Sequence, residues 1–234
     1  YCIYLLKKFI YPDSGIMITG LFGGIYSSTA TTVILARKER QGLQGPQTVA
    51  AIMIANGMMY LRILVLALIF NVAVARLLVV PFLVMFGVSY ILFRFNAGKT
   101  QDSAESDIDG NDGTSGKNPL EFRTASIFGL LFVVFALITD FVLKKYGSTG
   151  ITNLAYIVGV TDIDPFLLNL LQQKEGIGEM AITLAIINAT NSNNLLKMTY
   201  AISLSSKNIR RKLLTNFLIL IVSGLLISII YYLL

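Results

Sequence analysis

The sequence predicts an all-α, polytopic membrane protein with two repeated halves, each of which contains one discontinuous helix. Three observations lead to this fold class. Hydrophobic residues make up 55% of the 234 residues, more than in soluble globular chains. Several apolar runs approach or exceed the roughly 20 residues that a helix needs to cross a bilayer. Polar residues inside these runs recur at a constant distance along the chain, which indicates an internal duplication.

Seven apolar segments follow a short apolar stub at residues 1–6. The stub runs into Lys7 and Lys8, and we interpret it as the end of a truncated first span. The segments are expected at residues 15–37, 47–74, 76–95, 124–145, 151–172, 180–204 and 210–234.

The stretch at residues 98–123 separates the first transmembrane repeat, residues 1–97, from the second, residues 124–234. Most of it is acidic, rich in Gly and Ser, and almost without apolar residues. Such a composition cannot bury enough surface to order the chain, so a mobile acidic loop is expected here.

The repeat rests on four pairs of residues that lie 135 positions apart without a gap. The pairs include polar side chains within apolar stretches, where such side chains are rare and costly. The same spacing places residues 27–29 over residues 162–164. In membrane proteins, duplication of this kind often places a binding site between the two halves. The four pairs are Gly24 with Gly159, Asn56 with Asn191, Arg62 with Lys197, and Arg76 with Arg211.

Segments 15–37 and 151–172 differ from the others because each carries helix-weakening residues near its middle. The first has three glycines followed by hydroxyl residues, and the second has a glycine, two aspartates and a proline. Glycine weakens a helix interior, and proline removes a backbone donor and clashes with the preceding turn. Each segment is therefore predicted to form two half-helices that meet at an unwound centre, around residues 24–29 and 159–165.

Two topologies are open. If all seven segments cross the membrane, the halves are parallel and the basic loop residues divide nine against eight. If the two broken segments are re-entrant, the halves are inverted and the division becomes thirteen against four. The positive-inside rule favours the inverted topology.

Asp162 and Asp164 are the first candidates for an ion site. A carboxylate near mid-bilayer costs at least about 2.5 kcal/mol, so it commonly serves ion binding, proton relay or charge pairing. In an extended stretch alternate residues face the same way, so both aspartates can act as metal ligands, with Thr161 and exposed carbonyls as further oxygen donors. Aspartate is also a favoured helix N-cap, and capping can coexist with ion binding.

Ser27, Ser28 and Thr29 form the matching element of the first half. Their hydroxyls can solvate a partly dehydrated ion, and the N-terminus of a half-helix at this place would attract an anion. Close packing of small hydroxyl residues between helices is the alternative role.

Arg62 and Lys197 are intramembrane cations that we expect to pair with Asp162 and Asp164 across the repeat interface. Lys197 can snorkel from the last third of its segment, whereas Arg62 lies too deep to do so easily. The charges then form either a structural lock or a set of pairs that opens when an ion binds. All four side chains are expected to face the protein interior, because a lone buried charge is strongly destabilising. Asn56 and Asn191 supply neutral amide ligands on the same helices.

The composition argues against several other functions. The chain has no histidine and one cysteine, which removes the usual ligands and bases of zinc, haem, iron–sulfur and Ser-His sites. We therefore expect neither an enzyme nor a cofactor other than a bound inorganic cation. The net charge of +6 comes from Lys and Arg at the ends of spans, so no nucleic-acid partner is expected.

The stretches GLFGGIYSSTATT, MMYLR, NPLEFRTA and GVTDIDP resemble a bacterial and archaeal membrane family known as domain of unknown function 4010. The resemblance covers essentially the whole chain. Pro165 departs from the family, in which alanine commonly follows the second aspartate. The family is often joined to an MgtC/SapB-type domain linked to growth in low magnesium, which implies an upstream MgtC-like partner and raises magnesium as a candidate ion.

These features together predict a multi-pass transporter or channel component for an inorganic ion in a prokaryotic cell membrane. The ion is expected to be a cation, with magnesium or another divalent ion as a candidate. An anion transporter that uses Arg62 and Lys197 is one alternative. A non-transporting membrane subunit that binds a protein or lipid partner is another. The expected partners are the lipid bilayer, the ion, and a second copy of the chain or the MgtC-like domain.

Overall fold

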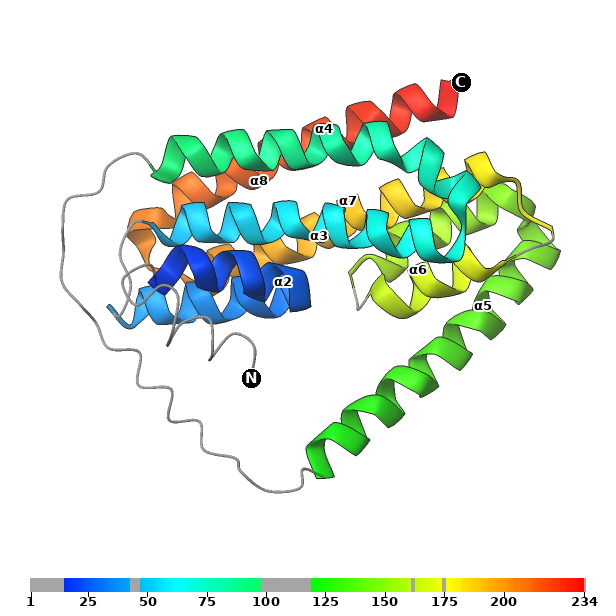
Figure 1. The fold of residues 1–234 in the computed structure, drawn as a ribbon, viewed down its shortest axis with the longest axis horizontal. Helices are drawn as coiled ribbons and strands as arrows, with labels where there is room; N and C mark the ends of the chain where they lie inside the picture. The colour runs from blue at the N-terminus through cyan, green and yellow to red at the C-terminus, as the bar shows by residue number, and fades with distance from the viewer. Residues whose placement is uncertain (1–14, 43–46, 98–118, 161–162, 174–175, 234) are drawn as a thin grey trace.

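The structure is a computed structural model that describes residues 15–42, 47–97, 119–160, 163–173 and 176–233. In this part of the chain all regular structure is α-helical, with seven helices and no strand (Figure 1). The all-α prediction is therefore confirmed. The helices are α2 (Gly15–Arg40), α3 (Thr48–Phe70), α4 (Val72–Ala97), α5 (Pro119–Val158), α6 (Ile163–Gln172), α7 (Glu179–Leu204) and α8 (Lys207–Leu233).

The turn between α3 and α4 lies earlier than expected, at Asn71. This residue is extended, with φ −154° and ψ 91°. Its Oδ1 accepts a hydrogen bond from the backbone N–H of Val74 at 3.2 Å. An asparagine that caps the next helix in this way ends the preceding one, which explains why α4 starts at Val72 rather than at residue 76.

Helix α5 also departs from the prediction. It begins at Pro119, so residues 119–123, which we assigned to the loop, are helical. It then continues through the predicted segment 124–145 into the start of the next one. The two parts are separated at Gly147, whose positive φ of 64° breaks the helical path. The stub at residues 1–6 and the loop residues 98–118 lie outside the described residues.

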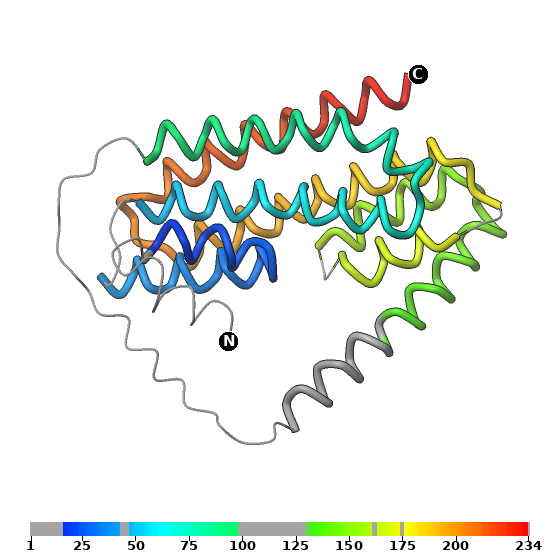
Figure 2. The backbone as a smooth tube through the Cα atoms, viewed as in Figure 1, coloured from blue at the N-terminus to red at the C-terminus, as the bar shows by residue number. Residues whose placement is uncertain are grey.

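Helix α2 is a hairpin of two half-helices. Ser27, in its middle, has extended dihedral angles, φ −156° and ψ 103°. The chain then doubles back, because a Cβ atom on Gly23 would lie 2.5 Å from Oγ1 of Thr31, eight residues later. Eight residues of continuous helix would span about 12 Å. Figure 2 shows the two arms of α2, in blue, running side by side in opposite directions. The predicted break within residues 24–29 is confirmed.

The second broken segment also forms a hairpin. Its first arm is residues 148–158 of α5, Gly159 and Val160 form a turn, and the second arm is α6. The predicted break within residues 159–165 is therefore confirmed. In Figures 1 and 2 this hairpin enters from the end of the molecule opposite to that of α2.

Two central helices, α3 and α7, carry the hairpins. Helix α3 packs against α2 and α4, and α7 packs against α5 and α8. In Figure 1, α3 and α7 run in opposite directions, and so do their outer partners α4 and α8. Equivalent helices of the two halves thus point opposite ways, which is the relation expected for inverted repeats.

The contacts of each half follow the predicted spacing of 135 residues to within one residue. A Cβ atom on Gly57 would lie 3.2 Å from Cβ of Ser89, where α3 meets α4. A Cβ atom on Gly224, which is 135 positions after Ser89, would lie 2.6 Å from Oδ1 of Asn191, where α7 meets α8. Because Gly57 corresponds to Ser192, the two helix pairs pack within one residue of the same register. Superposition of the complete halves stays a prediction.

Glycines let each hairpin rest on the backbone of its central helix. A Cβ atom on Gly24 would lie 2.5 Å from Cα of Ala55 in α3. A Cβ atom on Gly159 would lie 2.6 Å from the carbonyl oxygen of Ala189 in α7. Neither place has room for a side chain, and these two glycines are one of the repeated pairs.

Four helices, α2, α3, α4 and α8, are long and apolar enough to cross a membrane, by length and composition within the described residues. The polytopic membrane assignment rests on these helices, although α2 doubles back. Each arm of the α2 hairpin has twelve or thirteen residues, or about 18–20 Å of helix. That length is a little over half of a hydrocarbon core about 30 Å thick, so a hairpin that starts at one face of the core would end near the midplane.

Basic residues gather at one end of the molecule. The C-terminal ends of α2 and α4 and the N-terminal end of α8 lie together there (Figure 1). The opposite end carries Arg76, Lys144 and Lys145. In the inverted topology the smaller group of four basic residues consists of these three and Lys174, which lies outside the described residues. Re-entrant hairpins and this distribution agree with that topology rather than with the parallel one. The residues at the basic end are Arg37, Lys38, Arg40, Arg94, Lys207, Arg210, Arg211 and Lys212.

Candidate functional site

Arg62 connects the tips of the two hairpins. It projects from α3, and its Nη1 donates to the backbone carbonyl of Tyr26 at 2.7 Å. Its Nη2 lies 2.6 Å from Oδ1 of Asp164, with side chains that are 22% and 25% exposed. Tyr26 is the last residue before the break in α2, and Asp164 stands in the first turn of α6. One guanidinium therefore holds an oxygen atom from each tip.

The chemistry of these two oxygens explains the contact. A helix that stops inside a protein leaves its last carbonyls without intrahelical partners, and they carry the negative end of the helix dipole. The carbonyl of Tyr26 is such a group, and Asp164 adds a full negative charge. Arg62 supplies donors for both. The expectation that a carboxylate lies within salt-bridge distance of an intramembrane cation is confirmed.

The hydroxyl side chains of the first tip either cap the returning arm or donate to backbone carbonyls. Oγ of Ser27 accepts from the backbone N–H of Ala30 at 3.3 Å, as an N-cap does for the returning arm. Thr31 and Thr32 donate to the carbonyls of Ser27 and Ser28, each at 2.8 Å. Ser28 is buried and Thr29 is partly exposed. Of the predicted residues 27–29, Ser27 thus has a clear structural role at the break.

The second tip is described from Ile163 onward. Asp162 and Thr161 lie outside the described residues, so their predicted roles as ligands stay predictions. Asp164 lies near the N-terminus of α6, where a carboxylate is favoured by the helix dipole. Pro165 falls within the first turn of α6, where a missing N–H costs nothing. The described residues contain no cluster of three or more His, Cys, Asp or Glu side chains.

Lys197 behaves differently from Arg62. It is fully buried and does not snorkel. Its Nζ donates to Oδ1 of Asn56 at 2.5 Å and to the sulfur of Met59 at 2.9 Å, both on α3. Within the described residues no carboxylate lies within 4.0 Å of this ammonium, whereas Arg62 is the partly exposed cation. The suggestion that Lys197 snorkels was therefore wrong, because its ammonium points across the bundle to α3 rather than along α7.

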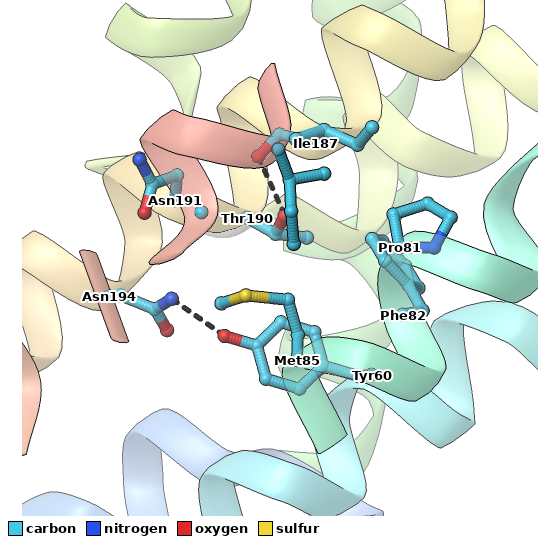
Figure 3. A pocket seen from close by; sticks show the side chains of 10 residues that line it. Tyr60, Pro81, Phe82, Met85, Ile187, Thr190, Asn191 and Asn194 are labelled. Atoms are coloured by element: carbon cyan, nitrogen blue, oxygen red, sulfur yellow. Dashed lines mark hydrogen bonds between the residues drawn. The ribbon is translucent and has the colours of Figure 1, made fainter. Parts of the chain in front are cut away.

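Asn56 and Asn191 do not form one site. Asn56 is fully buried, and its Nδ2 donates to Oδ1 of Asn194 at 3.1 Å. Asn194 in turn donates to the Tyr60 hydroxyl at 2.8 Å. Asn191 instead faces a small cavity among α3, α4, α7 and α8 (Figure 3). The residues that line this cavity include none from either hairpin, so Asn191 is not a ligand at the tips.

Helix α7 also holds the second hairpin through side chains. Ser192 donates to the carbonyl of Tyr156 at 2.6 Å, and Asn193 donates to the carbonyl of Gly159 at 3.2 Å. Gly159 follows the last residue of α5. Its carbonyl therefore lies at the end of the entering arm, as that of Tyr26 does in the first hairpin. In both halves, a side chain from the central helix satisfies a carbonyl at the end of the entering arm.

The sequence did not indicate the roles of the Tyr26 carbonyl, Met59, Tyr60 and Asn193. Backbone carbonyls leave no trace in a sequence, because every residue has one. Asn193 could have been suspected from the density of asparagines on α7. That helix has the length of a membrane span but carries four buried asparagines and a buried lysine, an expensive composition in lipid.

Comparisons with known proteins agree with the resemblance noted in the sequence. The family described as Domain of unknown function (DUF4010) matches residues 1–205. An "Uncharacterized protein" from Aquifex aeolicus (strain VF5) is 28% identical over 207 residues, covering 86% of this chain and 87% of that protein. No solved structure matches the chain.

Proposed function

The chain belongs to the DUF4010 family, and we propose that it is a transporter or channel component that moves an inorganic cation across a prokaryotic cell membrane. The observation that carries this proposal is the position of the Arg62 guanidinium between the Tyr26 carbonyl and the Asp164 carboxylate. Two oxygen acceptors, one from each re-entrant tip, converge on a single positive group.

A metal cation in the place of this guanidinium would find the same two oxygens. Hard cations such as sodium, magnesium and calcium prefer carboxylate and carbonyl oxygens. While no ion is bound, the guanidinium occupies the position of the cation and keeps the tips together. Asp162, two residues before Asp164, would add a second carboxylate and favour a divalent ion.

The position of the tips fits transport. In many transporters, substrate sites lie near the bilayer midplane, where discontinuous helices of inverted repeats meet. Here the hairpins enter from opposite ends (Figure 1). Movement of one hairpin opens the site to one side of the membrane, and movement of the other opens it to the opposite side. An arriving cation competes with Arg62 for Asp164 and so loosens the bridge between the tips.

The first hairpin is held firmly at its base, which suits a tip that moves. Oε2 of Glu39 accepts the backbone N–H of Ser206 at 2.8 Å, and Oε1 accepts the Ser206 hydroxyl at 2.5 Å. Ser206 directly precedes α8, where a carboxylate is favoured. The tip, in contrast, is joined to α3 by a polar side chain only through Arg62 in the described residues.

An anion is the second candidate, and one observation favours it. Arg62 and Lys197 place two positive side chains on the central helices, and Arg62 reaches both tips. An anion would be attracted to these two cations. If the protein is instead a non-transporting subunit, the pair of Arg62 and Asp164 is a permanent structural lock, and no ion crosses the membrane.

The test is ion flux in liposomes that contain the purified protein. A panel of sodium, potassium, magnesium, calcium, chloride and phosphate identifies the ion and its sign. We expect flux of at least one cation, and expect Asp164→Asn to reduce it at least tenfold. Asp140→Asn is the matched control, because it removes the exposed partner of Lys144 far from the tips. Absence of flux with every ion in the wild-type protein would refute the transport proposal.

A further inference from the structure

A chain of hydrogen bonds between α7 and α3 has a direction that Lys197 fixes. An ammonium group has donors only, so Oδ1 of Asn56 must face it, at 2.5 Å. Nδ2 of Asn56 then faces Asn194, whose Oδ1 accepts at 3.1 Å. Nδ2 of Asn194 is left to donate to the hydroxyl oxygen of Tyr60, at 2.8 Å. Each orientation follows from the one before it.

This series of hydrogen bonds provides no acceptor for the hydroxyl hydrogen of Tyr60. The oxygen of this hydroxyl already accepts from Asn194, and the hydrogen needs an acceptor of its own. No described residue supplies one, although the Tyr60 side chain is 1% exposed. A buried donor without a partner is unfavourable, because it has lost the water to which it was bonded in the unfolded chain.

Asn191 has the opposite deficiency. Its Oδ1 is buried and has no donor among the described residues, and the residue as a whole is 5% exposed. Asn191 is the repeat equivalent of Asn56, whose own Oδ1 receives the Lys197 ammonium. The amide oxygen of the second half thus lacks the donor that its counterpart has.

Both deficient groups line the same cavity. The polar wall consists of Tyr60, Thr190, Asn191 and Asn194, and the hydroxyl of Thr190 donates to carbonyls of its own helix. Pro81, Phe82 and Met85 of α4 lie on the apolar side (Figure 3). In Figure 3 the oxygen of Asn191 lies on the side of its amide group nearer to Asn194 and Tyr60. The cavity has room for about one water molecule.

We propose that one ordered water molecule occupies this cavity, accepts the Tyr60 hydroxyl hydrogen and donates to Oδ1 of Asn191. Buried waters occur where otherwise unpaired polar groups face a space of this size. With this water, the series of hydrogen bonds runs from Lys197 through Asn56, Asn194 and Tyr60 to Asn191. Every donor points the same way along the series, and in such an arrangement neighbouring hydrogen bonds strengthen one another. Carboxamide groups do not relay protons, so the chain orients Lys197 and joins α3 to α7 and does not conduct protons.

Gly224 gives the site its room on the α8 side. A Cβ atom there would lie 2.6 Å from Oδ1 of Asn191 and 2.9 Å from its Cγ. A side chain at this position would push the amide group out of its place beside the cavity. The glycine therefore preserves both the acceptor and the space for the water.

A double-mutant cycle on the purified full chain tests the water. If the water is present, Asn191→Leu displaces it and strands the Tyr60 hydroxyl, so the melting temperature falls. Tyr60→Phe then lowers the melting temperature by less in the Asn191→Leu protein than in the wild-type protein, because the stranded hydrogen is gone. A dry cavity gives the reverse: Asn191→Leu fills the space and raises the melting temperature, and the two shifts add. That result would overturn the proposal.

A structure of the wild-type protein at a resolution that shows ordered waters decides the matter if the variants do not fold. Density within hydrogen-bonding distance of both Tyr60 Oη and Asn191 Oδ1 supports the proposal. An empty cavity overturns it. Both outcomes are independent of ion flux, so either proposal can be refuted without affecting the other.

Discussion

The guanidinium of Arg62 lies 2.6 Å from the carboxylate of Asp164, although the two residues are 102 positions apart in the chain. The contact joins the central helix of the first half to the tip of the second hairpin. Because Arg62 also holds the carbonyl of Tyr26, it keeps both tips in one arrangement. The stability of that arrangement and the access of ions to it therefore depend on the same side chain.

The Arg62–Asp164 pair is expected to show strong coupling in a double-mutant cycle. Asp164→Asn leaves a largely buried guanidinium without its counter-charge, and we expect a loss of about 1–2 kcal/mol in the free energy of unfolding. Arg62→Met should cost a similar amount. The double variant should cost clearly less than the sum. Denaturation in mixed micelles measures each value, and simple additivity would show that the pair contributes little.

The buried Lys197 makes Asn56 more sensitive than an ordinary asparagine. Asn56→Leu removes the only oxygen acceptor of the Lys197 ammonium among the described residues, and we expect it to cost about 3–5 kcal/mol. Adding Lys197→Met to that variant removes the stranded charge and should recover most of the loss. Unfolding measurements compare the two proteins. If Lys197→Met brings no recovery, the ammonium has another partner and this reading of the network is wrong.

The packing of the first hairpin on α3 can be tested at Gly24. Gly24→Ala places a methyl group 2.5 Å from Cα of Ala55, so the hairpin must shift, and we expect a loss of at least about 2 kcal/mol. Gly87→Ala is the matched control, because nothing lies within 4 Å of its Cβ position. That change should be neutral or stabilise α4 by up to about 1 kcal/mol. Equal effects at the two sites would contradict the close contact.

The inverted topology predicts that the two hairpin bases lie on opposite sides of the membrane. In a Cys2→Ser background, Lys38→Cys and Ser148→Cys should react with a membrane-impermeant maleimide from opposite faces. The basic end, which includes Lys38, should be cytoplasmic. Labelling of intact cells and of inverted vesicles distinguishes the faces. Labelling of both positions from one side would favour parallel repeats.

Much of the fold could be predicted from the sequence because its causes are local. Runs of apolar residues set the helices, and Gly, Ser and Pro placed the two breaks. The boundary at Asn71 was missed because an asparagine inside an apolar run can cap a helix or continue it, and only the bond to Val74 shows which. The boundary at Gly147 agrees with the prediction, because the expected segments end at residue 145 and begin again at residue 151, and the positive φ of Gly147 divides α5 between them.

The site was harder to predict because its geometry depends on the rotation of the helices. The spacing of 135 residues made Asn56 and Asn191 equivalent and suggested that both are ligands of one site, yet Asn56 bonds Asn194 and Asn191 faces the cavity. Helix α7 carries buried asparagines on several faces, so the sequence could not show which one meets α3. The pair between Arg62 and Asp164 was expected from charge alone, since two opposite charges at depth have few other partners.

The central claim is that a cation can take the place of the Arg62 guanidinium between the two tips. Cation titration of the Arg62→Gln protein, followed by its melting temperature, tests this most directly, because a ligand that binds only the folded state raises that temperature. We predict that at least one hard cation stabilises Arg62→Gln more than the wild-type protein, and that the shift disappears in Arg62→Gln/Asp164→Asn. A melting temperature of Arg62→Gln that no cation changes, or a shift that persists without Asp164, would contradict the account.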